Sequence, residues 1–283
     1  MIRDSVVHFV LVLLFLAVTP ASAQIDLTGS WAVRIHEDLE GELLGDYTGL
    51  PINDEARARA DAYQGAYLSM PDRQCIMFTT HYIVRGPQSL RITSDIDPIS
   101  GRVVAVGMSG AIDRMPRTIW LDGRPHPSPL ARHTAAGFST GVWQGDTLLV
   151  TTTHLAEGVL TRNGVPSSDQ ATIREYIVRH GDRLTIAMIL YDPVYLEEPY
   201  LRSQTWVLDP AMQVVPEPCE PTVEVPRAAG EVPHHLPGTN PDLRDVADKY
   251  KLPLEGVRGG AATLYPEFRK RARTERPAPA GAR

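Results

Sequence analysis

The amino-acid sequence predicts an all-β protein in which antiparallel strands form a closed or nearly closed β-barrel, with a β-sandwich as the alternative. The first observation is a series of short runs rich in β-branched and aromatic residues, separated by Gly, Pro or Asp. The second is a pair of tight β-hairpins whose turns contain Gly145-Asp146 and Gly181-Asp182. Barrels of about eight to ten strands leave room for a small ligand, so the fold class already bears on function.

The first half of the chain contains one expected helix among short strands. A first strand is expected at residues 27–35. Residues 53–64 are expected to form a helix, because Asn53 is a good N-cap and two acidic residues follow it. Further short strands are expected at residues 78–85, 90–93, 102–108 and 117–121.

Two hairpins and one more strand complete the predicted barrel. Residues 142–143 are expected to pair with 147–154, and residues 172–180 with 183–191. Apolar side chains share one face of the last of these strands, and Asp192 continues that face. A strand at residues 202–208 follows.

The composition also divides the chain. We expect a signal peptide at residues 1–23, the barrel domain at 24–215, a Pro-rich arm at 216–267 and a disordered basic tail at 268–283. Within the arm, Asn240-Pro241 opens a short helix that ends near Tyr250.

The N-terminus predicts export. A charged start, an apolar run at residues 6–18 and the triplet Ala21-Ser22-Ala23 are typical of a secretory signal peptide. The apolar run is too short to span a bilayer comfortably. We therefore expect a secreted or periplasmic protein that is not inserted in a membrane.

Composition argues against several functions. A net charge of −6 and the absence of a basic stripe in the main body argue against a nucleic-acid partner. Lys249, Lys251 and Lys270 are the only lysines, so the barrel has none for a Schiff base or a phosphate loop. Two cysteines in an exported chain, Cys75 and Cys219, favour a disulfide.

Residues 137–141 (GFSTG) fit the G-x-S-x-G pattern of a nucleophile elbow. That motif requires a strand that turns sharply into a helix, whereas a hairpin follows here. We therefore interpret Gly137 and Gly141 as a bend into a strand rather than Ser139 as a nucleophile.

The densest polar cluster, Asp122-Gly123-Arg124-Pro125-His126, follows a predicted strand. Its carboxylate, guanidinium and imidazole could hold a ligand or perform acid–base chemistry, or they could form a turn in which Asp122 pairs with Arg124. Asp192 is either another acid–base group near Glu175 or a turn-capping residue.

These considerations give two sets of site residues. The candidate catalytic residues are Asp122, His126 and Asp192. The candidate ligand-binding residues are Arg124, Trp143, His154 and Tyr195. The histidines, including His81 and His154 on expected strands, lack the spacing of metal ligands, so neither a metal nor another cofactor is predicted.

The motifs also occur together in a recognisable order. Residues 117–127 (R-x-I-W-L-D-G-R-P-H-P), 137–153 (G-x-S-x-G-x-W-x-G-D-T-L-x-V-x-T-T), 174–176 (R-E-Y) and 192–195 (D-P-x-Y) resemble a large family of exported bacterial proteins usually labelled hypothetical. The resemblance implies a secreted, lipocalin-like β-domain and no particular activity. Members commonly have G-H-S and P-H-S-E where this chain has GFS at 137–139 and PSSD at 166–169, so two family histidines are missing.

We therefore expect an exported lipocalin-like barrel that binds a small, partly apolar molecule. One alternative is a cofactor-independent lyase, hydratase, isomerase or cyclase that uses Asp and His at the barrel mouth. The other is a structural envelope protein with a filled core.

Overall fold

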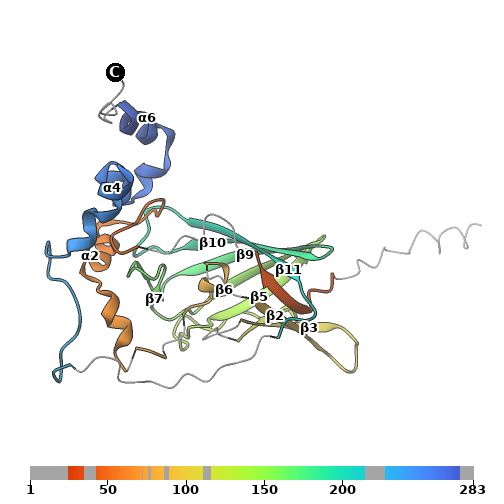
Figure 1. Ribbon diagram of the computed structural model, residues 1–283. Coiled ribbons are helices and arrows are strands. Elements are labelled where there is room, and N and C mark those ends of the chain that lie inside the picture. The colour runs from red at the N-terminus through yellow and green to blue at the C-terminus, as the bar shows by residue number, and fades with distance from the viewer. Residues whose placement is uncertain are drawn as a thin grey trace, which may run out of the picture.

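The main body of the protein is a closed β-barrel with helices at one end (Figure 1). The computed structural model describes residues 25–34, 43–71, 73–75, 78–85, 89–110, 116–213 and 227–274. The predicted signal peptide and Cys219 lie outside these residues. Cys75 is disulfide-bonded. No helix in the described part of the chain has the length and apolar character needed to cross a bilayer.

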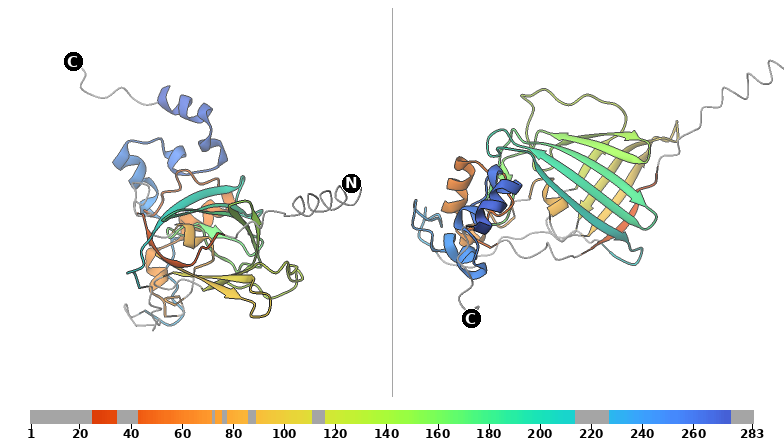
Figure 2. Two further views of the ribbon diagram at one scale, coloured as in Figure 1. Left: turned by 90° about the vertical axis from the view of Figure 1, so that its right-hand side faces the viewer. Right: turned by 90° about the horizontal axis from the view of Figure 1, so that it is seen from above.

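Nine strands of the described chain form the barrel, in the ring order β1-β11-β10-β9-β6-β5-β4-β3-β2 and back to β1. The left view of Figure 2 shows the ring from one end. The prediction of a barrel is confirmed. The strands are β1 (Gly29–Val33), β2 (Leu90–Ile96), β3 (Val103–Gly110), β4 (Arg117–Trp120), β5 (Phe138–Gln144), β6 (Thr147–Thr153), β9 (Thr172–His180), β10 (Arg183–Tyr191) and β11 (Tyr200–Leu208).

Both predicted hairpins are present. β5 and β6 pair from Phe138 opposite Thr153 to Gln144 opposite Thr147, and β9 and β10 meet at His180 opposite Arg183. Gly145 and Gly181 hold φ angles of 58° and 59° at the first central position of each turn. A glycine with positive φ at that position matches a type II′ turn, whose twist suits the flanking strands.

One strand pair departs from the antiparallel prediction, because β4 and β5 are parallel. A parallel pair needs a long connection that returns along the sheet, and residues 121–137 supply it. This crossover segment, residues 121–137, arches outside the strands in the right view of Figure 2. The two strands approach closely at Gly141, where a Cβ atom would lie 3.0 Å from Ile119 of β4.

Side chains alternate between the barrel interior and solvent. Along β10, for example, even-numbered residues are buried and odd-numbered residues are exposed or half-buried. The same alternation in the other strands fills the interior, which we call the lumen, with mostly apolar side chains: Trp31, Leu90, Ile92, Val106, Met108, Ile119, Leu148, Val150, Ile173, Ile177, Leu184, Ile186, Met188, Leu190 and Trp206.

Short elements cover one end of the barrel. The predicted helix is α2 (Asp54–Ala62), and the Asn53 side chain caps it by accepting the Ala56 N–H at 3.0 Å. The prediction of a strand at residues 78–85 is wrong. This segment ends in a helical turn, α3 (Tyr82–Arg85), that packs against β10 and β11. Ile83 and Val84 enter the core from this turn. Two further short elements, η2 (Gly65–Ser69) and the hairpin of β7 (Gly158–Val159) and β8 (Pro166–Ser167), were not predicted.

The C-terminal arm, residues 227–274, also lies at this end (Figure 1). The predicted helix near residue 240 is present, with the Asn240 side chain accepting the Asp242 N–H at 2.9 Å. The expectation of a disordered tail from residue 268 is wrong as far as Thr274, because that stretch is helical. The elements are η3 (Pro241–Arg244), α4 (Asp245–Tyr250), α5 (Leu254–Val257), η4 (Ala261–Leu264) and α6 (Pro266–Thr274).

Candidate functional site

Asp122 and Arg124 lie on the outside of the barrel. The Arg124 guanidinium donates to both oxygens of Asp122, with Nε–Oδ1 at 2.9 Å and Nη2–Oδ2 at 2.6 Å, and it stacks 3.5 Å from the ring centroid of Trp120. Trp120 is outward-facing, since Ile119 beside it is buried. Hydrogen bonding from Arg124 holds the pKa of Asp122 below its ordinary value. These contacts are those of a surface turn, the alternative that the sequence left open.

His126 takes part in a chain of hydrogen bonds farther along the crossover segment. Its Nδ1 lies 2.7 Å from Thr153 Oγ1 and its Nε2 lies 2.8 Å from Thr140 Oγ1. Thr153 Oγ1 is also 2.7 Å from Nδ1 of His154, whose Nε2 is 2.9 Å from the carbonyl oxygen of Ser128.

The series of hydrogen bonds runs in one donor-to-acceptor direction when both histidines are neutral. The Ser128 carbonyl can only accept, so His154 carries its proton on Nε2 and its Nδ1 accepts from Thr153. The hydroxyl hydrogen of Thr153 is then used, so His126 donates to Thr153 from Nδ1 and accepts from Thr140 at Nε2. Burial, with a smaller effect of His154, lowers the pKa of His126, which favours the neutral ring at neutral pH.

The histidine chain does not reach the lumen. Thr140 and Thr153 face outward, because the inward positions beside them belong to Ser139 and Thr152, whose hydroxyls bond each other at 2.8 Å. His154 was expected at the end of a strand that reaches residue 154, but β6 ends at Thr153 and His154 has a φ of 57°. The predicted bend at Gly137 is present, and Ser139 is a buried strand residue.

Asp192 caps a turn. It is 4% exposed, and its carboxylate accepts the N–H and the hydroxyl of Ser168 at 2.7 and 2.8 Å. The N–H groups of Val194 and Tyr195 donate to the same carboxylate at 3.0 and 3.2 Å. All four donors belong to loop residues, so the Asp192 carboxylate fixes the conformation of these loops. This is the role that the turn-capping alternative gives it.

Tyr195 joins this turn to α2. Its carbonyl oxygen accepts the N–H of Asn53 at 3.0 Å, and the guanidinium of Arg59 lies 5.1 Å from its ring centroid. The side chain is buried, which raises the pKa of the phenol. Tyr195 thus lies among side chains that fasten the helix to the barrel end.

The structure does not bring the candidate catalytic residues together. In the described chain no hydrogen bond or ion pair links Asp192 to Asp122 or His126, which lie on the outer wall. Glu175, the proposed neighbour of Asp192, bonds Arg117 instead. The alternative in which Asp192 and Glu175 share acid and base roles therefore finds each carboxylate bonded to another partner, Ser168 and Arg117 respectively.

The lumen holds a different polar set. Arg117 on β4 and Glu175 on β9 form a two-pronged ion pair across it, with Nη1–Oε2 at 2.6 Å and Nη2–Oε1 at 2.9 Å. Both side chains are 1% exposed. Removing one member would leave a buried charge, which typically costs about 3–5 kcal/mol.

Gln204 on β11 is the least satisfied polar side chain of the lumen. It is 1% exposed and lies on the inward face with Tyr200 and Trp206. Neither its Nε2 nor its Oε1 has a hydrogen-bond partner. A buried polar group left in this condition costs about 1–3 kcal/mol.

Three further inward-facing nitrogen atoms share this condition, and the first is the Nε of Arg117, whose Nη1 and Nη2 bond Glu175. Trp143, a candidate ligand-binding residue, packs against the core from β5, and its buried indole N–H has no acceptor. Arg202 is partly buried on β11, and its Nε has no acceptor either. Trp143 lies four strands away from Gln204 in the ring, on the opposite side of the lumen.

Sequence reasoning did not single out Arg117, Arg202 or Gln204 as lumen residues, although the strand pattern around them indicates inward positions. In the run Tyr200-x-Arg202-x-Gln204-x-Trp206, polar residues interrupt the face that two aromatic residues mark as buried. Glu175 likewise separates Ile173 and Ile177. A polar residue at an inward position of a strand says more about a possible site than a polar residue in a loop does, because polar residues are rarely buried without a partner.

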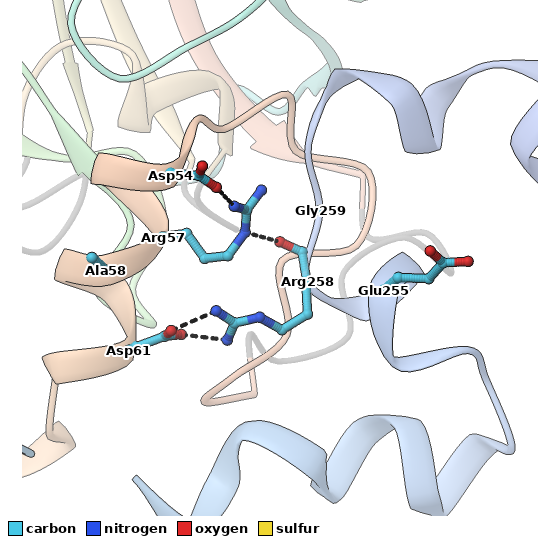
Figure 3. A pocket seen from close by; sticks show the side chains of 7 residues that line it. All are labelled: Asp54, Arg57, Ala58, Asp61, Glu255, Arg258 and Gly259. Carbon is cyan, nitrogen blue, oxygen red and sulfur yellow. Dashed lines mark hydrogen bonds and ion pairs between the residues drawn. The ribbon is translucent and has the colours of Figure 1, made fainter. Parts of the chain in front are cut away.

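Two hollows lie outside the barrel. One, of about 500 Å³, is bounded by α2 and α5 (Figure 3). Within it Arg258 bonds both oxygens of Asp61, and Arg57 bonds Asp54 and the Arg258 carbonyl. Its charges thus pair with one another and hold the arm. The other, of about 340 Å³, separates α5 from α6.

Two further findings, on metal ligands and on similarity to known proteins, complete the description of the site. Among the described residues, no group of three or more His, Cys, Asp or Glu side chains is arranged to hold a metal ion. Compared with known proteins, the chain matches no family model, no curated protein and no solved structure.

Proposed function

We propose that this is an exported, lipocalin-like barrel protein that binds a small, partly apolar molecule in the lumen. The observation that carries the proposal is Gln204, a buried amide with both of its polar atoms unpartnered inside a closed barrel. A ligand that offers one acceptor and one donor would satisfy it. The proposed site therefore moves from the outer-wall residues Asp122 and His126 to the interior.

The lumen wall agrees with a ligand of mixed character. Most inward side chains are apolar, such as Val150, Ile177 and Met188, and they would contact an apolar body. A few polar groups at separate points, Gln204 and the Trp143 indole among them, would fix its orientation. We do not favour the enzyme alternative, since the one carboxylate on the inward faces of the described strands, Glu175, is paired with Arg117.

The substitution Gln204→Met tests the proposal. It keeps the length of the side chain and removes both unsatisfied atoms, so without ligand the protein should gain about 1 kcal/mol of unfolding free energy. Binding should weaken about tenfold, because the ligand loses its hydrogen bonds to the amide. Denaturant titration measures the first effect. Calorimetric titration with naphthaleneacetate and naphthaleneethanol, two small partly apolar probes, measures the second.

Ser203→Ala is the matched control, since Ser203 lies beside Gln204 but faces solvent. It should change neither quantity. If the wild-type protein binds neither probe while Gln204→Met is more stable, the core is simply filled and the proposal is contradicted. Equal binding by wild type and Gln204→Met would also contradict it.

A further inference from the structure

The charged side chains of the lumen indicate which chemical class of ligand would bind there. This inference rests on the proposed function. Along the inward faces of the described strands, the ionisable side chains are Arg117, Glu175, Arg179 and Arg202. The first two neutralise each other. Glu175 is thus the only carboxylate on these faces, and its charge is already used.

Arg179 is satisfied at the rim of the barrel. Its Nε donates to the Gly181 carbonyl at 2.8 Å and its Nη1 donates to the Asp26 carbonyl. The guanidinium also lies 5.2 Å from the ring centroid of Trp31. These contacts fix Arg179 as part of the barrel wall near the hairpin turns.

Arg202 is left as the uncompensated charge. No carboxylate of the described chain forms an ion pair with it; its Nη1 has one long contact, 3.5 Å, to the Tyr200 hydroxyl, and its Nε has no acceptor. Gln204 is two residues along the same face of β11, so the two side chains are neighbours. A guanidinium stays charged at every physiological pH, and a counter-charge would stabilise it in this partly buried position.

We infer that the ligand is an organic anion of the carboxylate class. Its headgroup binds the Arg202 guanidinium and accepts from the Gln204 amide, and its apolar body lies among the aliphatic side chains of the lumen. The planar guanidinium matches a carboxylate with two parallel hydrogen bonds. The low dielectric of the barrel interior strengthens this attraction relative to water.

The test compares two probes of the same size and different charge. Naphthaleneacetate and naphthaleneethanol are titrated calorimetrically into the full-length protein and into Arg202→Met, Arg202→Lys and Arg174→Met. Arg174 lies on the outer face of β9 and controls for the loss of one positive charge. Arg202→Lys keeps the charge and tests for rescue.

The wild type should bind the anion at least tenfold more tightly than the alcohol. Arg202→Met should abolish this preference while changing affinity for the alcohol less than threefold, and Arg202→Lys should restore much of it. Arg174→Met should behave as wild type. Equal binding of both probes by wild type and Arg202→Met would overturn the inference and leave the proposed function standing. Failure of both probes to bind wild type would overturn the proposed function, and the inference with it.

Discussion

At the scale of single residues, the lumen shows two ways in which a β-barrel treats buried polar groups. Glu175 meets the two-pronged donor of Arg117, and their hydrogen bonds offset much of the cost of removing both charges from water. Gln204 has no such partner within the chain. The contrast between satisfied and unsatisfied groups points to a ligand more strongly than residue types in a loop do.

His81 provides a residue-scale prediction about pH. It is 1% exposed, its Nδ1 lies 2.9 Å from Thr79 Oγ1, and its Nε2 lies 2.8 Å from the Val159 carbonyl. Burial lowers its pKa to about 4, although its hydrogen bond to Val159 and the nearby charge of Asp192 act in the opposite direction. The ring is therefore neutral in the folded protein down to mildly acidic pH.

The sign of the effect follows from proton binding. In the unfolded chain His81 binds its proton near its ordinary pKa, about 6.5, so between that pH and about 4 the unfolded state holds more protons. Stability is fully present above this window and decreases as pH falls through it. Denaturant titrations should show the wild type losing about 2 kcal/mol between pH 7 and pH 5 through this residue.

His81→Gln is the comparison for that prediction. It retains groups that can bond Thr79 and the Val159 carbonyl but has no ring to titrate. Its stability should depend less on pH over the same interval, by about the same 2 kcal/mol, whatever its stability at neutral pH. Parallel pH profiles for the two proteins would refute the assignment.

At the scale of elements, what the sequence predicted was local. The hairpins of β5–β6 and β9–β10 follow from Gly145, Gly181 and the alternation on either side, all within a few residues. The parallel pairing of β4 with β5 depends on how a 17-residue connection, residues 121–137, passes round the barrel. No local pattern encodes that path.

The errors have similar physical causes. The apolar residues Ile83 and Val84 suit a buried strand and a buried helical turn equally well, so α3 was read as a strand. The Asp122–His126 cluster was placed at a barrel mouth because it follows a strand, and only the crossover carries it along the outer wall. Trp143 packs against the core from β5, and its role in ligand binding stays a prediction.

The C-terminal arm gives an element-scale prediction. Arg258 bonds Asp61 of α2 at 2.6 and 2.5 Å (Figure 3). Tyr47 donates to the same carboxylate at 3.0 Å. Asp61→Asn should weaken this anchor, so the arm should detach about tenfold more often while the barrel stays folded. Hydrogen exchange and trypsin cleavage at arm residues measure the opening.

Asp54→Asn is the matched control on the same helix. Asp54 pairs with Arg57, but its side chain is fully exposed, so the substitution should leave arm protection unchanged. If Asp61→Asn and Asp54→Asn exchange alike, the ion pair to Arg258 does not hold the arm.

At the scale of the whole molecule, sign of charge separates the surface from the interior. The chain carries a net charge of −6, whereas the ionisable groups facing the lumen of the described barrel carry an excess of positive charge. An anion that moved from solvent into the lumen would leave a protein surface whose net negative charge repels it. It would reach side chains whose net positive charge attracts it. The barrel end opposite the hairpin turns is covered by α2, α3 and the arm (Figure 1).

Native mass spectrometry of the full-length protein, purified from the cells that produce it, tests whether the lumen takes up a small molecule. We expect a mass in excess of the polypeptide that disappears on denaturation, is recovered as an organic acid in the extract, and is reduced in Gln204→Met. A mass equal to that of the polypeptide alone, with no small molecule in the extract, would contradict it.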